Sequence, residues 1–142
     1  MTLIDLKNYL QNARAGTKVR QVVYDVSAVL NSGAKEYPLV CWDLENAKPI
    51  VKDLRTGQGT MRVNVLCADI VEPETDTDTD LKLASYDAIE ATLVAYLAAV
   101  EALASVTIPN KADIEVEYYP AGLVSVDREL AVRYAVTLRL WC

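Results

Sequence analysis

The acidic run Glu74–Asp80, which reads ETDTDTD, is the stretch whose residue types and spacing come nearest to a chemical site. Positions one, three, five and twelve of a calcium-binding loop are matched by Asp76, Asp78, Asp80 and Asp87. That template needs glycine at position six, where this chain has Leu81, and glutamate at position twelve, where it has the shorter Asp87. Because a helical pattern already covers Leu83, the run cannot wrap around an ion, and we predict no metal site.

Helix capping explains the acidic run better. Threonine and aspartate oxygens accept hydrogen bonds from the first free N–H groups of a helix. Negative charge at that end is also stabilised by the helix dipole, by about 0.3–1 kcal/mol. We therefore predict a solvated capping loop before a helix, and contact with another subunit is the alternative.

The remaining residues offer little for catalysis. The chain has no histidine, the commonest general base and metal ligand. Its cysteines, Cys41, Cys67 and Cys142, are widely spaced within apolar runs. We predict that they are buried thiols in a protein made in a reducing cytoplasm, with no zinc site or disulfide. No cofactor and no enzymatic activity are predicted.

Composition sets the broad class. The chain has 142 residues, 52% of them apolar, which suits one domain spanning residues 1–142 with a packed core. The formal net charge of −6 argues against a duplex-DNA reader, which needs a basic stripe to neutralise phosphates. The longest apolar stretch is bounded by Glu90 and Glu101, so no membrane partner is predicted.

Two amphipathic helices are predicted. Residues 2–14 place an apolar stripe at helical spacing, with Thr2 as a possible cap and Gly16 beyond the end. This stripe is expected to pack on its own domain, with a partner surface as the alternative. Residues 81–104 have a core-facing set at intervals of three and four: Tyr86, Ile89, Leu93, Leu97, Val100 and Leu103. A second face rich in alanine predicts that this helix is buried on more than one side.

Five strands are predicted around these helices. Residues 19–30 and 37–44 are expected to form a long hairpin. A loop follows, with an exposed and mobile tip at Lys52–Gly59. The next strand, Met61–Val71, has an inward set of Met61, Val63, Val65 and Cys67, or alternatively Leu66, Ala68 and Ile70.

The last two strands, 114–118 and 130–141, also alternate. The expected fold is therefore α+β, a mostly antiparallel sheet of about five strands with an N-terminal helix and one long helix packed on it.

This layout resembles the tail terminator or tail completion proteins of long-tailed bacteriophages. The resemblance rests on NSGAKEYPLVCWDL, on MRVNVLCADIVEPETDTDTD leading into the helix, and on GLVSVDRELAVRYAVTLRLWC. It covers nearly the whole chain and is one of layout rather than of a short motif. It implies a virion structural protein, assembled in the host cytoplasm, that forms a ring of six-fold symmetry, caps the tail tube and joins it to the neck.

The resemblance also implies partners: copies of the chain itself, the tail tube protein and the neck or head–tail adaptor protein. DNA would pass through the central channel without specific binding, which the −6 charge suits. A closed ring requires a heterologous head-to-tail interface, and the isolated protein is expected to be monomeric or weakly associated. Six interface residues are candidates, each of which could instead be merely exposed: Lys52, Arg55, Gln58, Asp76, Asp78 and Asp80.

Three rival functions remain open at this stage. The first is another virion component, such as a neck adaptor or a tube or baseplate protein. The second is a small cytoplasmic enzyme with paired carboxylates, in which Asp25, Asp43 or Asp69 would line a concave pocket. The third is a monomeric protein-binding module.

Overall fold

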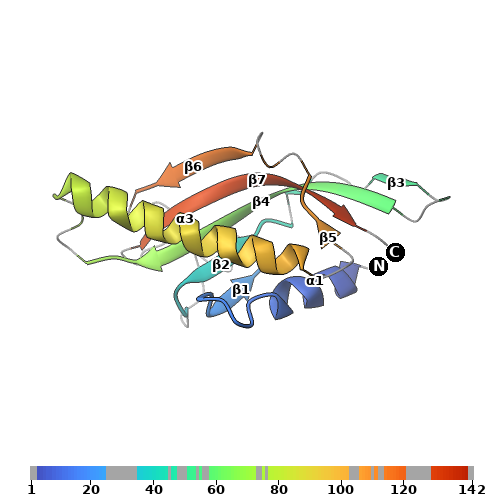
Figure 1. The fold of residues 1–142 in the computed structure, drawn as a ribbon, viewed down its shortest axis with the longest axis horizontal. Helices are drawn as coiled ribbons and strands as arrows, with labels where there is room; N and C mark the ends of the chain where they lie inside the picture. Colours follow the sequence, from blue (N-terminus) through green and yellow to red (C-terminus); the bar gives the residue numbers. More distant parts are fainter. Residues whose placement is uncertain are drawn as a thin grey trace.

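The computed structural model describes residues 3–24, 35–44, 46–47, 51–53, 55, 58–72, 75, 77–102, 106–109, 111, 114–120 and 129–140. Two helices, α1 and α3, cover one face of a curled sheet (Figure 1). The helices are α1 (Leu3–Asn12) and α3 (Thr79–Glu101). The strands are β1 (Gln21–Val23), β2 (Leu39–Trp42), β3 (Val51–Asp53), β4 (Gln58–Ile70), β5 (Val106–Thr107), β6 (Glu115–Tyr119) and β7 (Glu129–Leu140).

The sheet is mixed, so the α+β class is confirmed but the mostly antiparallel arrangement is wrong. Its strand order is β1-β2-β4-β7-β5, with β3 added to β4 and β6 added to β7. The pairs made by β4 and β7 are antiparallel, whereas β1 runs parallel to β2. The predicted hairpin over residues 19–44 is therefore also wrong. The described strand stops at Val23 and β2 starts at Leu39, which leaves a connection long enough to cross over between parallel neighbours.

The prediction that Lys52–Gly59 is the exposed tip of a loop is also wrong in part. Val51–Asp53 is a strand rather than part of a loop, and it pairs with the start of β4, placing Lys52 opposite Gly59 and Asp53 opposite Gln58. Backbone pairing with a strand that is itself held by β7 orders both flanks of the segment. Of the predicted exposed tip, Arg55 is exposed, whereas Gln58 is half-buried and Gly59 is buried.

The centre of the sheet is the long antiparallel ladder between β4 and β7, paired from Gly59–Leu140 to Ile70–Glu129. Side chains alternate across it, because successive strand residues point to opposite faces. The predicted inward set of β4 is confirmed by burial of Met61, Val63, Val65 and Cys67. Of the alternative set, Ile70 is 56% exposed, but Ala68 is buried on the opposite face. The helix-facing residues of β7 are likewise buried: Val132, Tyr134, Val136, Leu138 and Leu140.

Helix α3 buries one face on this ladder. Its buried residues are Ile89, Thr92, Leu93, Tyr96, Leu97 and Val100. The core-facing prediction is confirmed for Ile89, Leu93, Leu97 and Val100, whereas Leu103 lies outside the described residues. By length and composition α3 could also cross a membrane, a test that the core helix of a water-exposed domain passes equally well.

A hydrogen-bonded pair of aromatic rings joins α1, α3 and β2. The Trp42 Nε1–H donates to the Tyr96 hydroxyl at 2.9 Å, and that hydroxyl donates to the Leu10 carbonyl oxygen at 2.6 Å. Trp42, Tyr96 and Leu10 are all fully buried. Because the chain satisfies every polar atom in this relay, α1 is held on its own domain, as predicted.

Two further sequence predictions are confirmed. Gly16 has φ of +78°, the left-handed conformation that glycine adopts without steric cost, and it reverses the chain after α1. Cys41 and Cys67 are buried free thiols, and burial raises the pKa of Cys67 to about 12. Cys142 lies outside the described residues.

Candidate functional site

The acidic run ends as a helix cap. The backbone of Asp78 is extended and its carboxylate accepts a hydrogen bond from the Leu81 N–H at 3.1 Å, so Asp78 is the N-cap of α3. Asp80 lies exposed in the first turn, where the helix dipole favours negative charge. The capping prediction is therefore confirmed for Asp78. Asp76 lies outside the described residues.

The calcium-loop template does not fit this geometry. Residues from Thr79 onward are helical, so Asp87 lies two turns into α3. Within the part of the chain that the structure describes, no group of three or more possible metal ligands converges.

The two groups of predicted interface residues lie at opposite ends of the molecule. Asp78 and Asp80 mark the start of α3 at the left end of Figure 1, whereas Lys52 and Gln58 belong to the paired strands β3 and β4 at the right end. A single small partner could not touch both groups. If each contacts a partner, the two partners lie on different sides of the protein.

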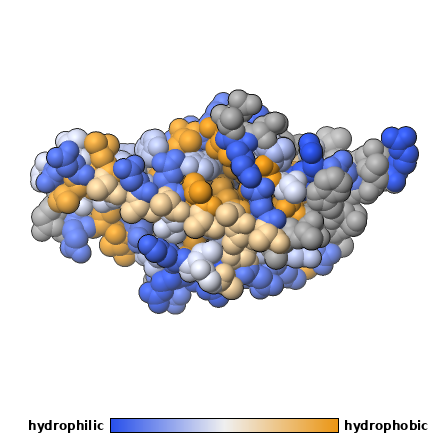
Figure 2. All heavy atoms as spheres, in the orientation of Figure 1, coloured by the Kyte–Doolittle hydropathy of each residue, from blue (hydrophilic) through white to orange (hydrophobic). Residues whose placement is uncertain are grey.

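The outward face of α3 is a surface that sequence reasoning placed wrongly. Residues at alternating spacings of three and four are all exposed: Leu81, Ala84, Ala88, Ala91, Ala95, Ala98 and Ala102. Leu83 and Val94 beside them are 55% and 51% exposed. The prediction that α3 is buried on more than one side is thus wrong for the single chain, because the sheet covers one face only. Figure 2 shows a pale orange band along α3. We call this exposed apolar surface the outer face.

A carboxylate clamp, which the sequence did not reveal, ties α3 to the sheet edge. Glu90 accepts hydrogen bonds from the hydroxyls of Tyr118 on β6, at 3.0 Å, and Tyr134 on β7. The Tyr86 ring meets the Tyr118 ring edge-on at 5.2 Å between centroids. The hydrogen bond that Tyr118 makes to Glu90 raises the pKa of Tyr118. Burial, together with its own hydrogen bond to Glu90, raises the pKa of Tyr134. Both phenols therefore stay protonated. The cluster links α3 to β6 and β7 through hydrogen bonds.

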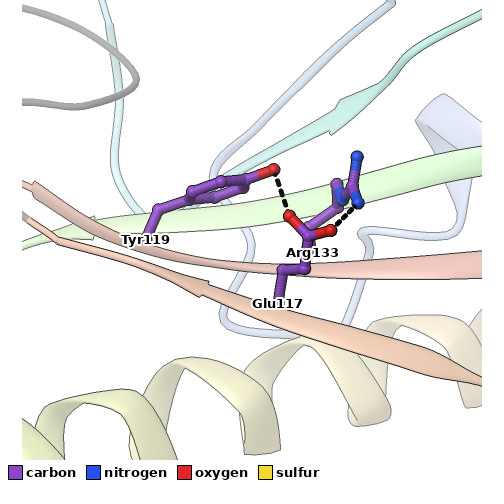
Figure 3. Close-up of polar contacts among 3 residues, drawn as sticks. All are labelled: Glu117, Tyr119 and Arg133. Carbon is purple, nitrogen blue, oxygen red and sulfur yellow. Dashed lines mark hydrogen bonds and ion pairs between the residues drawn. The ribbon is translucent and has the colours of Figure 1, made fainter.

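The opposite face of the sheet has its own polar cluster. Glu117 of β6 bridges the guanidinium of Arg133 on β7 and accepts a hydrogen bond from the Tyr119 hydroxyl at 2.9 Å (Figure 3). The Arg133 guanidinium also lies 6.0 Å from the Tyr119 ring centroid. These residues are partly exposed and mutually satisfied, so they stabilise the strand pair rather than form a reactive centre.

An open hollow of about 540 Å³ lies where α1 turns into β1. The residues lining it are Gln11, Arg14, Arg20, Gln21, Lys35 and Glu36. It holds one carboxylate among the described residues and does not include Asp43 or Asp69, which the carboxylate-enzyme rival requires. Asp43 instead accepts hydrogen bonds from Asn46, and Asp69 accepts one from the Ile70 N–H. Asp25 lies outside the described residues.

The chain matches no protein-family model, and no curated protein is significantly similar to it.

Proposed function

We propose that this protein is a non-enzymatic virion component that assembles as a ring of six copies on the end of a bacteriophage tail tube. The ring caps the tube and joins it to the neck or head–tail adaptor, and DNA passes through its channel. The observation that carries the proposal is the outer face of α3. A core completed by one face of this helix leaves an apolar second face open, which suits contact with another protein surface.

The shape of that face favours contact with a neighbouring copy. Alanine side chains let an approaching backbone come close, while Leu81 and Leu83 at one end offer larger apolar contacts. An interface that joins one surface to a different surface of the next copy repeats around a ring until it closes. The net charge of −6 suits a channel that DNA crosses without sticking.

Electron microscopy and proteomics of purified phage test this proposal. The chain should be present in the particle, and antibody labelling should place it at the junction of tail and neck. Absence of the chain from intact particles would contradict the proposal. Long tubes formed by the purified protein would favour a tube protein, and isolated rings would favour a terminator or an adaptor. Depletion of the chain from an infection should leave tails that overgrow or fail to join heads.

A further inference from the structure

Charge is segregated along this chain. Residues 1–35 contain five cationic side chains, Lys7, Arg14, Lys18, Arg20 and Lys35, and only two carboxylates. Residues 69–101 contain nine carboxylates and one cation, Lys82. In the fold, Arg14, Lys18 and Arg20 lie in or next to the turn after α1, and the acidic segment leads into and along α3.

The basic segment builds the hollow, and hydrogen bonds hold its lining in place. Arg14 Nη1 donates to the Arg20 carbonyl oxygen at 2.8 Å, across the turn that Gly16 permits. On the other side, the Glu36 N–H donates to Gln21 Oε1 at 2.8 Å. Among the described residues neither the Arg14 nor the Arg20 guanidinium forms an ion pair. The hollow therefore presents the guanidiniums of Arg14 and Arg20 to an anionic group, and Arg14 is held by its bond to the Arg20 carbonyl oxygen.

The start of α3 has the complementary chemistry. Asp80 and Asp87 are exposed on the first two turns and form no ion pair within the described residues. Asp78 is already used as the helix cap. In Figure 1 this acidic end lies at the left tip of the molecule, and the turn between α1 and β1 lies beneath its middle. The two surfaces do not meet within one copy.

We propose that the hollow is a docking site for the acidic start of α3 of a neighbouring copy. The proposal rests on the ring assembly proposed above and names one of its contacts. Carboxylates of Asp80 and Asp87 would enter the hollow and pair with Arg14 and Arg20, with geometry that arginine forks favour. Because the site and its ligand lie on different parts of the same chain, the contact is head-to-tail and can repeat from copy to copy.

A charge-exchange experiment tests the contact. The hollow variant carries Arg14→Glu and Arg20→Glu, and the acid variant carries Asp80→Lys and Asp87→Lys. Each alone should lose ring formation on tails and weaken self-association about tenfold or more at low salt, because like charges face each other. Mixed in equal amounts, the two variants should regain rings, since each hollow then meets an opposite charge. Circular dichroism and the thermal midpoint check that both variants fold.

The matched control carries Lys18→Glu and Arg62→Glu. These two exposed cations lie outside the lining of the hollow, and reversing them changes the net charge as much as the hollow variant does. The control should form rings like the wild type. Equal loss in the control would overturn the proposal, because the effect would then follow bulk charge.

Zero-length coupling of amines to carboxylates gives an independent readout. In a mixture of heavy-isotope and ordinary protein, Lys35 should couple to Asp80 or Asp87 of the other isotope, and high salt should abolish the product. Rings that the hollow variant forms as well as the wild type would contradict this contact alone. If such rings failed only to join tubes, the hollow would belong to a different partner. Wild-type protein that never enters a ring would contradict the proposed function itself.

Discussion

The two faces of α3 have opposite relations to the rest of the molecule. The inner face is buried without exception at Leu93, Tyr96 and Val100, where it completes the core with β4 and β7. The outer face, on the opposite side of the helix, is alanine-rich and exposed. The same helix thus carries one surface that stabilises the fold and one that the fold does not use. Substitutions on the two faces should separate stability from assembly.

The largest expected difference is between the neighbours Leu93 and Val94, which are 0% and 51% exposed. Leu93→Ala should lower the free energy of unfolding by about 2–5 kcal/mol, because it removes buried methyl groups and leaves a cavity. Val94→Ala should change it by about 0.5 kcal/mol or less. Urea unfolding followed by circular dichroism measures both. Similar losses in the two variants would mean that both faces of α3 are covered in solution.

The next effect concerns the hydroxyl of Tyr96. Tyr96→Phe should cost about 1–3 kcal/mol, because the Trp42 Nε1–H and the Leu10 carbonyl oxygen would remain buried without a partner. Tyr86→Phe is the matched control, since its hydroxyl makes no hydrogen bond among the described residues. An equal cost for the two substitutions would show that the relay contributes nothing beyond ring packing.

Alkaline pH sharpens the same comparison. Burial raises the pKa of Tyr96 above its usual value of about 10, so the folded protein keeps a proton that the unfolded chain releases. The stabilisation from this group is complete below about pH 10 and is lost as the pH rises further. Tyr24, whose pKa burial raises to about 12, adds to the loss. Urea midpoints should therefore fall above pH 10, and less steeply in Tyr96→Phe.

A smaller effect is expected at the Glu90 clamp. Glu90→Gln should cost about 1 kcal/mol, because a neutral amide accepts more weakly from Tyr118 and Tyr134. The loss should be local. Amide hydrogen exchange should speed up in β6, while β4 keeps its protection. Asp87→Asn, one turn earlier and exposed, should leave exchange in β6 unchanged. Uniform acceleration across the sheet would show that Glu90 supports the whole fold instead.

The smallest effect on stability is expected at the outer face itself. Ala95→Glu should alter the free energy of unfolding by about 0.5 kcal/mol or less, because the side chain enters water. Under the proposed function it should nevertheless reduce incorporation into tails, because it places a charge on an apolar contact. A large loss of stability in the isolated protein would mean that this face is already buried there.

Regular patterns in the sequence predicted most of the fold. Alternation located the inward face of β4, and spacings of three and four located the inner face of α3. The pairing of β1 with β2 was not predictable, because a three-residue strand carries too little pattern to give its direction. Tyr96 was missed because its burial depends on partners, Trp42 and the Leu10 carbonyl oxygen, that only the tertiary fold supplies. Thr92 was also missed; it is buried, and its hydroxyl donates within α3 to the Ala88 carbonyl oxygen.

The candidate sites were predicted less well. The helix cap at Asp78 follows from local chemistry and was predicted correctly. The outer face of α3 was wrongly predicted to be buried, because alanine is common both in tightly packed interiors and on exposed helix surfaces. The Glu90 clamp and the basic hollow each join segments distant in the sequence, and no spacing rule connects them.

The unpaired edge of strand β6 affects whether two copies of the protein can pair edge to edge. Among the described strands it pairs with β7 alone, so its other margin offers free backbone groups to any passing strand. Glu115 and Glu117 are exposed along it, and although Glu117 pairs with Arg133, a second β6 laid alongside would bring carboxylates of the two strands together. That repulsion discourages edge-to-edge stacking of this strand with a second copy.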